Sequence, residues 1–313
     1  MTGYQALREA AAWLDLSARG RIRATGEDRV RLLHAMCTNH IQNLQPGEGC
    51  YAFFLNAQGR ILADAQILAL PEALLIDTEP ETRCSLYAHL DKYIIADDVS
   101  LEDTTAETVA IGIEGPQAAE VLTRLGAPLP ASLYSHLAWG DGLVIRFSVT
   151  GQPGFSIMAP LGRREALIRD IEAAGAVRAS DQEARAVRLE RGHPRYGEDI
   201  TDRNLPHETQ LLGALHFTKG CYLGQEIVER VRSRGGVHRF LMPLEIEGDD
   251  PLEPGAVISA EGTAVGELTS AAWSPSLGRM VALGYLRLPD IPPGAALACA
   301  GRPVRLKAAQ AGG

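Results

Sequence analysis

The sequence predicts an α+β protein that ends in a small β-barrel or sandwich. As far as Arg239, predicted helices and strands are mixed without the regular strand–helix–strand spacing of a doubly wound sheet. From Phe240 onward, short β-type runs alternate with glycine and proline, which is typical of a small antiparallel barrel. We therefore place a domain boundary at Gly235–Gly236, between an α+β region (1–235) and a C-terminal barrel domain (236–313).

A helix followed by a β-hairpin is predicted between residues 21 and 70. Val30, Leu33 and Cys37 recur at helical spacing. Two apolar runs then flank the segment 57–60, Ala-Gln-Gly-Arg, as they would flank a hairpin loop.

The middle of the chain continues the alternation of strands and helices. Strands are predicted over 74–77, 107–115, 142–149 and 154–160, and helices over 82–94, 116–126, 163–175 and 180–192. In the last of these helices Ser180 and Glu183 form a capping-box pattern, and Gly192 closes the helix. In the C-terminal domain the β-type runs are 240–248, 256–274, 280–288 and 302–309.

The composition is that of a globular cytosolic protein. Of 313 residues, 46% are hydrophobic and 22% charged. No apolar run approaches the roughly 18 residues of a membrane span, and the N-terminus lacks the pattern of a secretory signal. A formal charge of -9 argues against a nucleic-acid surface over the whole protein.

The cysteines and histidines indicate neither a disulfide framework nor a metal site. The five cysteines are scattered and form no CxxC pair: Cys37, Cys50, Cys84, Cys221 and Cys299. We interpret all but Cys221 as structural. The candidate histidines have spacings that match no helix-face ligand pair: His193, His207 and His216.

Cys221 lies in the segment KGCYLGQEIVER, residues 219–230. Apolar residues from Leu223 onward predict a helix, and Cys221 would lie at or just before its first turn. The positive end of the helix dipole and the nearby Lys219 would favour a thiolate there. From local chemistry alone, a buried and inert cysteine is the alternative.

The octapeptide KGCYLGQE resembles the signature of the YgfZ-type folate-binding proteins. These are relatives of the glycine-cleavage T-protein (aminomethyltransferase) and assist iron–sulfur cluster assembly. The resemblance covers nearly the whole chain, including RLERGHPRYGEDIT (188–201), LPHE (205–208), the segment 37–64 and GELTSAAWSPSLGRMVALGYLR (266–287). It implies three domains in a ring around a central folate-binding cavity, with a region of two α+β subdomains before the barrel.

The resemblance also implies site residues. Cys221 would be the functional, catalytic cysteine. The residues implied to bind tetrahydrofolate are Asp64, Phe155, Arg188, Glu190, Tyr196, Glu208, Lys219, Tyr222, Gln225 and Glu226. Carboxylates can accept pterin N–H groups, aromatic rings can stack on the pterin, and cations can bind the glutamate tail.

The sequence departs from the T-protein pattern at three positions. Gln152 and Ser156 stand where relatives carry acidic residues, and Ala63 precedes Asp64 where T-proteins have paired aspartates. These departures argue against aminomethyl transfer.

The leading hypothesis is therefore a folate-dependent accessory factor for assembly or repair of [4Fe–4S] clusters in client enzymes, including tRNA-modifying enzymes. Its partners would be iron–sulfur assembly proteins and those clients. Cluster contact at Cys221 would be transient, because one thiolate cannot supply the four ligands of a stable cluster.

Two alternatives remain open. One is a tetrahydrofolate-dependent aminomethyltransferase or another one-carbon transferase that uses Asp64. The other is RNA binding by the arginines at 230, 232, 234 and 239, for which the simpler explanation is a helix C-terminus balanced by cations.

Overall fold

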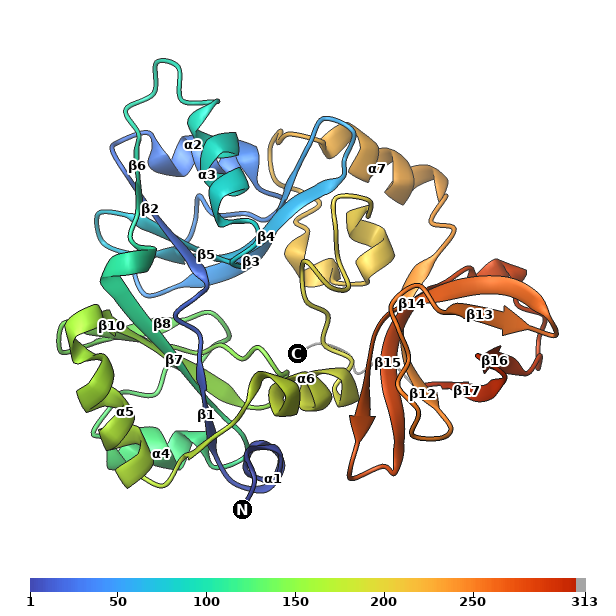
Figure 1. Ribbon diagram of the computed structural model, residues 1–313. Coiled ribbons are helices and arrows are strands. Elements are labelled where there is room, and N and C mark those ends of the chain that lie inside the picture. Colours follow the sequence, from blue (N-terminus) through green and yellow to red (C-terminus); the bar gives the residue numbers. More distant parts are fainter. Residues whose placement is uncertain (308–313) are drawn as a thin grey trace.

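The computed structural model describes residues 1–307, apart from the side chain of Arg234. Two β-sheets with flanking helices and a closed β-barrel are arranged around the centre of the molecule (Figure 1). The predicted α+β fold with a C-terminal barrel is confirmed. No helix in the described part is long and apolar enough to cross a membrane.

The first sheet has five antiparallel strands in the order β3-β4-β5-β2-β6. Its strands are β2 (Gly20–Thr25), β3 (Gly49–Leu55), β4 (Ile61–Ala69), β5 (Leu74–Thr78) and β6 (Ser100–Asp103). Helices α2 (Arg29–Met36) and α3 (Arg83–Asp91) pack against it and share its hydrophobic core. The predicted β3–β4 hairpin forms, and its register places Tyr51 opposite Gln66 and Phe53 opposite Asp64.

The second sheet has six strands in the order β11-β1-β7-β10-β9-β8. They are β1 (Ala12–Asp15), β7 (Thr108–Glu114), β8 (His136–Trp139), β9 (Gly142–Ile145), β10 (Gly154–Pro160) and β11 (Val177–Arg178). Only β1 and β11 pair in parallel. Helices α4 (Ala118–Arg124) and α5 (Arg164–Ala173) supply apolar residues such as Val121 and Leu167 to its core.

The N-terminal segment joins the two sheets. After helix α1 (Gly3–Glu9), strand β1 belongs to the second sheet and strand β2 to the first. None of these three elements was predicted from the sequence. The connection between the strands crosses from one sheet to the other, and it places Arg19 between them with 8% of its surface exposed.

Helix α6 (Asp181–Glu190) links the sheets to the barrel. The predicted capping box is present, since the Ser180 side chain accepts from the Glu183 N–H and the Glu183 carboxylate accepts from the Ser180 N–H. The helix packs against α1 on one side and against strands β14 and β15 of the barrel on the other.

An irregular segment leads from α6 to helix α7 (Gln225–Arg234). Short 3-10 helices occur here at Pro206–Thr209 and Leu212–Ala214, and elsewhere at Thr105–Glu107, Leu161–Arg163 and Leu288–Asp290. The N-cap of α7 is Gly224, whose φ of 82° suits a residue without a side chain.

The barrel closes in the order β12-β15-β14-β13-β16-β17. Its strands are β12 (Phe240–Ile246), β13 (Val257–Ala260), β14 (Thr263–Ser274), β15 (Arg279–Leu286), β16 (Leu297–Cys299) and β17 (Arg302–Leu306). Strand β16 was not predicted. The last two residues of the predicted run 302–309 lie outside the described residues.

Candidate functional site

A cavity of about 620 Å³ lies where the two sheets meet helix α6. Strand β1 contributes Asp15 and the connection after it contributes Arg19. The β3–β4 hairpin contributes Tyr51, Asp64 and Gln66, and other walls come from 134–150 and from α6 and the residues after it. A cavity of this size can enclose a small organic molecule.

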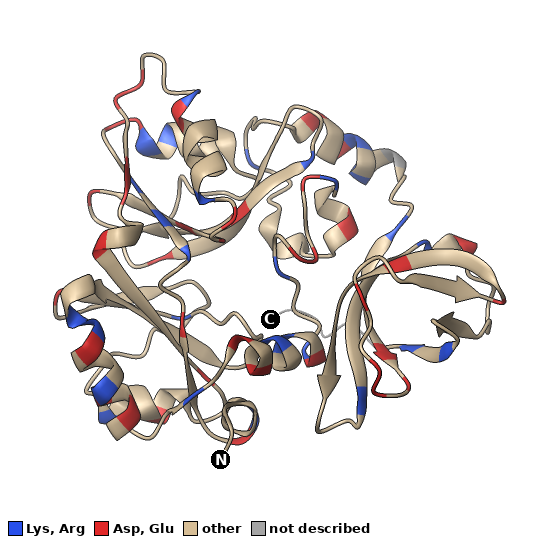
Figure 2. Ribbon diagram, viewed as in Figure 1, with Lys and Arg blue, Asp and Glu red and all other residues tan. Residues whose placement is uncertain are grey.

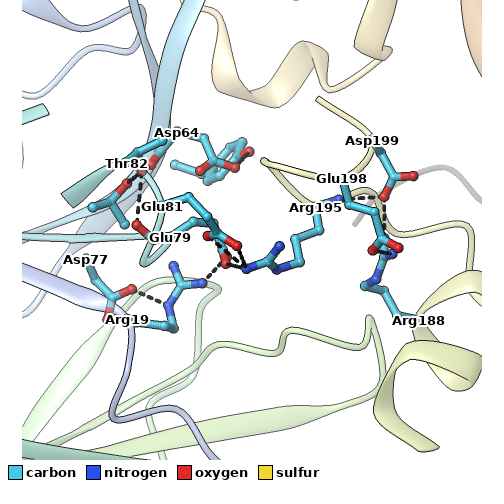
Figure 3. Close-up of polar contacts among 12 residues, drawn as sticks. Arg19, Asp64, Asp77, Glu79, Glu81, Thr82, Arg188, Arg195, Glu198 and Asp199 are labelled. Atoms are coloured by element: carbon cyan, nitrogen blue, oxygen red, sulfur yellow. Dashed lines mark hydrogen bonds and ion pairs between the residues drawn. The ribbon is translucent and has the colours of Figure 1, made fainter. Parts of the chain in front are cut away.

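One side of the cavity is held by a chain of ion pairs (Figure 3). Arg19 donates to Asp77 at 2.5 Å and also pairs with Glu79. Arg195, which follows α6, pairs with Glu79 at 2.9 Å and with Glu81 at 2.7 Å. Burial alone would lower the pKa of Arg19, but the adjacent Asp77 and Glu79 raise it above its ordinary value. Both arginines therefore carry a positive charge, and the neighbouring carboxylates balance that charge.

Helix α6 carries a second set of ion pairs. Arg188 contacts Asp199 at 2.5 Å and also pairs with Glu198. Asp199 is 1% exposed and accepts a further hydrogen bond of 2.6 Å from Thr269 in the barrel. These contacts fix the cavity wall to the barrel.

Asp64 differs from the other buried carboxylates of the cavity because it forms no ion pair with any residue the structure describes. Its Oδ2 accepts a hydrogen bond of 2.7 Å from the Tyr51 hydroxyl. Burial and the neighbouring charge of Glu79 raise its pKa to about 6, although the Tyr51 hydrogen bond acts in the opposite direction. A carboxyl group of this pKa can both accept and release a proton near neutral pH.

Two aromatic rings and a histidine complete the polar surroundings. The rings of Tyr51 and Tyr134 are stacked, with centroids 6.3 Å apart and an interplanar angle of 16°. Burial and the adjacent Arg188 lower the pKa of His193 to about 4, so this imidazole is neutral at physiological pH.

Of the residues that sequence analysis assigned to folate, Asp64 and Arg188 line the cavity. Tyr196 is buried nearby and its hydroxyl donates to the Leu62 carbonyl at 2.7 Å. Phe155 lies in the core of the second sheet. These last two side chains contribute no cavity wall.

Two of the carboxylates predicted to bind folate, Glu190 and Glu208, instead connect segments of the protein that are distant in sequence. Glu190 accepts from Ser274 of the barrel at 2.5 Å and pairs with Arg8. Glu208 pairs with Arg239 at 3.2 Å, at the start of the barrel. Both have partners within the protein and neither borders the cavity.

The octapeptide segment Lys219–Glu226 also lies outside the cavity lining. Lys219 is 6% exposed and donates to three backbone carbonyls, those of His34, Cys37 and Asn39, at 2.6, 2.7 and 2.7 Å. Tyr222 is buried, and Gln225 accepts from its N–H at 3.3 Å. Glu226 is exposed.

Cys221 is exposed, three residues before the N-cap of α7. The helix begins at Gln225, two residues after the predicted start at Leu223, so that Cys221 lies before the first turn and not in it. Lys219, expected to favour the thiolate, instead directs its ammonium group to the backbone carbonyls near α2.

The arginines after residue 229 do not form an uninterrupted basic surface. Arg232 lies over the Phe217 ring at 4.4 Å, and Arg239 is paired with Glu208. The side chain of Arg234 lies outside the described part of the structure. Figure 2 shows acidic residues at the start of α7 and basic residues toward its end, the arrangement that complements a helix dipole.

No group of histidine, cysteine and carboxylate side chains among the described residues could hold a metal ion. His216 lies near His40, with ring centroids 5.0 Å apart, whereas His207 lies near Phe217.

Sequence reasoning missed several cavity residues, above all Tyr51, Gln66 and Glu79. A signal for Gln66 was present: in the apolar run of β4, Asp64 and Gln66 are polar residues at alternate positions, which places them on one face of a strand. Glu79 and the arginines that bind it come from distant parts of the sequence and carry no local signal.

Two family models match the chain. The GCVT N-terminal domain matches residues 2–219, and the glycine cleavage T-protein C-terminal barrel domain matches residues 239–310. Among solved structures, the glycine cleavage system aminomethyltransferase T from Bartonella henselae has a TM-score of 0.87 at 24% identity. That likeness covers 96% of this chain and 86% of the other, and it shows a shared fold.

Curated relatives with similar sequences are named as transferases. A chloroplast protein of Arabidopsis thaliana with a provisional transferase name, At1g60990, is 28% identical over 282 residues. The match covers 88% of this chain but 65% of the plant protein, so the chain spans less than two thirds of that relative. The aminomethyltransferase of Thermosynechococcus vestitus is 29% identical over 293 residues, which cover 90% of this chain and 78% of the relative.

Proposed function

We propose, on the premise that this chain belongs to the glycine cleavage T-protein family, that it is a tetrahydrofolate-dependent one-carbon transferase that takes a methylene group from an aminomethyl donor. This exchanges the order of the two main hypotheses drawn from the sequence, since the relatives cited above are named as transferases. The observation that carries the proposal is Asp64, a buried carboxylate without a cation partner among the described residues, at the wall of a cavity large enough for a small ligand.

The proposed reaction balances without an oxidant or reductant. The methylene carbon loses its bonds to the amino nitrogen, which leaves as ammonia, and to the rest of the donor, and it gains bonds to N5 and N10 of tetrahydrofolate. The protons of N5–H and N10–H pass to the two leaving groups. Asp64, with a pKa of about 6, is suited to accept one of these protons and return it to a leaving group.

The surrounding residues would hold this carboxylate in place. The Tyr51 hydroxyl fixes the orientation of the Asp64 side chain through its hydrogen bond. The ion pairs of Arg19 and Arg195 with Glu79 join three segments of the chain on one side of the cavity, so that this wall is rigid before the ligand binds.

The test is formation of methylene-tetrahydrofolate by the purified protein from tetrahydrofolate and an aminomethyl donor. We expect Asp64→Asn to lower the rate about 100-fold or more, in the range of a lost general acid–base group. Asp91→Asn, at an exposed position at the end of α3, is the matched control and should leave the rate unchanged. A protein that releases no methylene-tetrahydrofolate from any aminomethyl donor would overturn the proposal.

A second candidate function is support of iron–sulfur cluster assembly through Cys221. The observation that favours it is the exposure of this thiol, outside the cavity, whereas Cys37 and Cys299 are buried. An exposed thiolate can contact a partner protein, and iron is a metal that thiolates bind well. Folate in the cavity and a thiol on the surface could then serve different steps.

This candidate is tested in cells that lack the protein, by the activity of a [4Fe–4S] enzyme relative to an iron-independent enzyme. Cys221→Ser should fail to restore that activity if the thiol is required. Cys84→Ser removes the exposed thiol in α3 and should restore it fully. Equal restoration by both variants would refute a role for Cys221.

A further inference from the structure

Two neighbouring side chains of strand β4 have buried polar atoms without a partner in the described structure. They are Oδ1 of Asp64 and Nε2 of Gln66. The two residues are 7% and 3% exposed, and both line the cavity. Because they are two positions apart on a strand, their side chains leave the same face of the sheet.

Unpaired polar atoms of this kind are informative because burial without a hydrogen bond costs free energy. The other buried atoms without a partner in the described part belong to Arg29, His89, His136, His207, His216 and Tyr285. None of those residues borders this cavity. The missing partners of Asp64 and Gln66 are therefore best supplied by a ligand.

The pair has a defined chemical preference. An ionised carboxylate oxygen can only accept a hydrogen bond, and an amide N–H can only donate one. The pair therefore complements a ligand edge on which an N–H group lies beside a carbonyl oxygen. In tetrahydrofolate, N5–H and the ring carbonyl occupy such neighbouring positions.

We propose that Asp64 and Gln66 together recognise this edge of the reduced folate ring through hydrogen bonds. Asp64 Oδ1 accepts a hydrogen bond from N5–H, and Gln66 Nε2 donates one to the ring carbonyl oxygen. The inference rests on the proposed function and deepens it, because it assigns Gln66 as the residue that orients the ring and thereby brings N5 to Asp64. When N5 forms its new bond to the methylene carbon, the N5 proton passes to Asp64.

The same contacts select the oxidation state of the ring. In folic acid, N5 carries no hydrogen and presents a lone pair, which would face the acceptor oxygen of Asp64. Two acceptors that face each other cannot form a hydrogen bond and repel. The site should therefore prefer tetrahydrofolate to folic acid, and this preference should depend on Asp64.

The first experiment measures binding by calorimetry without oxygen, using tetrahydrofolate, folic acid and p-aminobenzoylglutamate, which lacks the ring. We expect Gln66→Leu to weaken tetrahydrofolate binding about tenfold, the effect of one lost hydrogen bond, and to leave p-aminobenzoylglutamate binding unchanged. Gln58→Leu makes the same change at an exposed position of the same hairpin and should alter neither. Asp64→Asn, which offers an N–H group to N5, should reduce the preference for tetrahydrofolate over folic acid.

A second measurement separates recognition from a structural role. Without ligand, Gln66→Leu should melt at the same temperature as wild type or higher, because it removes a buried donor that has no partner. With saturating tetrahydrofolate, the variant should gain less in melting temperature than wild type. A merely structural glutamine would instead lower the melting temperature in both conditions.

The outcomes distinguish this inference from the proposed function. If wild type binds tetrahydrofolate and Gln66→Leu binds it equally well, the role of Gln66 is wrong and the transferase proposal stands. An equal loss of tetrahydrofolate and p-aminobenzoylglutamate would also refute ring recognition. If wild type binds no folate at all, both proposals fail.

Discussion

The segment Lys219–Glu226 and strand β4 differ in two respects: how specific their sequence motifs are, and whether their buried polar atoms have hydrogen-bond partners. The segment carries the most specific motif of the chain, yet its lysine has three carbonyl partners and its tyrosine is buried in a core cluster. Strand β4 carries no such motif, yet Asp64 and Gln66 each leave a buried polar atom without a described partner. Buried polar side chains whose hydrogen bonds are all made within the protein stabilise the fold. Buried polar atoms that lack a partner at the wall of a cavity instead indicate where a ligand binds.

The largest expected effect tests the structural side of this contrast. Replacing Lys219 with methionine leaves two buried carbonyls and one part-buried carbonyl without their donor, so we expect a loss of about 4 kcal/mol in the free energy of unfolding. Urea denaturation measures the change. Lys92→Met, at an exposed position, should change stability by at most about 0.5 kcal/mol. If Lys219→Met is as stable as wild type, the motif lysine is not a structural residue.

The next effect concerns the pH dependence of stability. The pKa of Asp64 is about 6 in the folded protein, against 3.8 as its ordinary value, so the folded state holds the proton more tightly than the unfolded state. The resulting stability is complete below about pH 4 and is lost as the pH rises to about 6, a difference of about 3 kcal/mol.

Asp64→Asn cannot titrate and should lack this loss. Its free energy of unfolding relative to wild type should therefore increase between pH 4 and pH 6.5, and Asp91→Asn should show no such trend. Parallel curves for wild type and Asp64→Asn would place the pKa of Asp64 near its ordinary value and weaken its role as a proton carrier.

The smallest effect tests the partner of Asp64. The Tyr51 hydrogen bond lowers the pKa of Asp64, so Tyr51→Phe should raise that pKa further. If the ionised carboxylate accepts the proton, the rise of activity with pH should move upward by about 0.5 to 1 pH unit, and the rate at pH 7 should fall a few-fold. Rate measurements across pH check this, with Tyr93→Phe as the control. A downward movement would show that the protonated form of Asp64 is the active one.

Local patterns of the sequence predicted the elements that local contacts determine. The capping box of Ser180 and Glu183 and the turn of the β3–β4 hairpin involve residues within a few positions of each other, and both are present. Strand β1 was missed because it has four residues and its pairing partners, β7 and β11, follow about 100 and 165 residues later.

The candidate site shows the same division. Asp64 was proposed as a site residue through resemblance to a family. Gln66 and Tyr51 can be recognised as cavity residues only from the strand register, which places them opposite each other. The contacts of Arg19 and Arg195 with Glu79 join segments about 60 and 116 residues apart, and no periodicity of the sequence encodes them. Burial, which decides the pKa of Asp64, is likewise a property of the assembled sheets.

The crossing of the N-terminal segment between the two sheets has a consequence for biosynthesis. Strand β1 leaves the ribosome before the other strands of its sheet, but its parallel neighbour β11 is completed only at residue 178. Until then the six-stranded sheet has an open position beside β1, and the outer edge of this apolar strand has no partner. The first strand to be made is thus among the last to be enclosed, which makes the newly synthesised N-terminal half a natural client for chaperones that bind extended apolar segments.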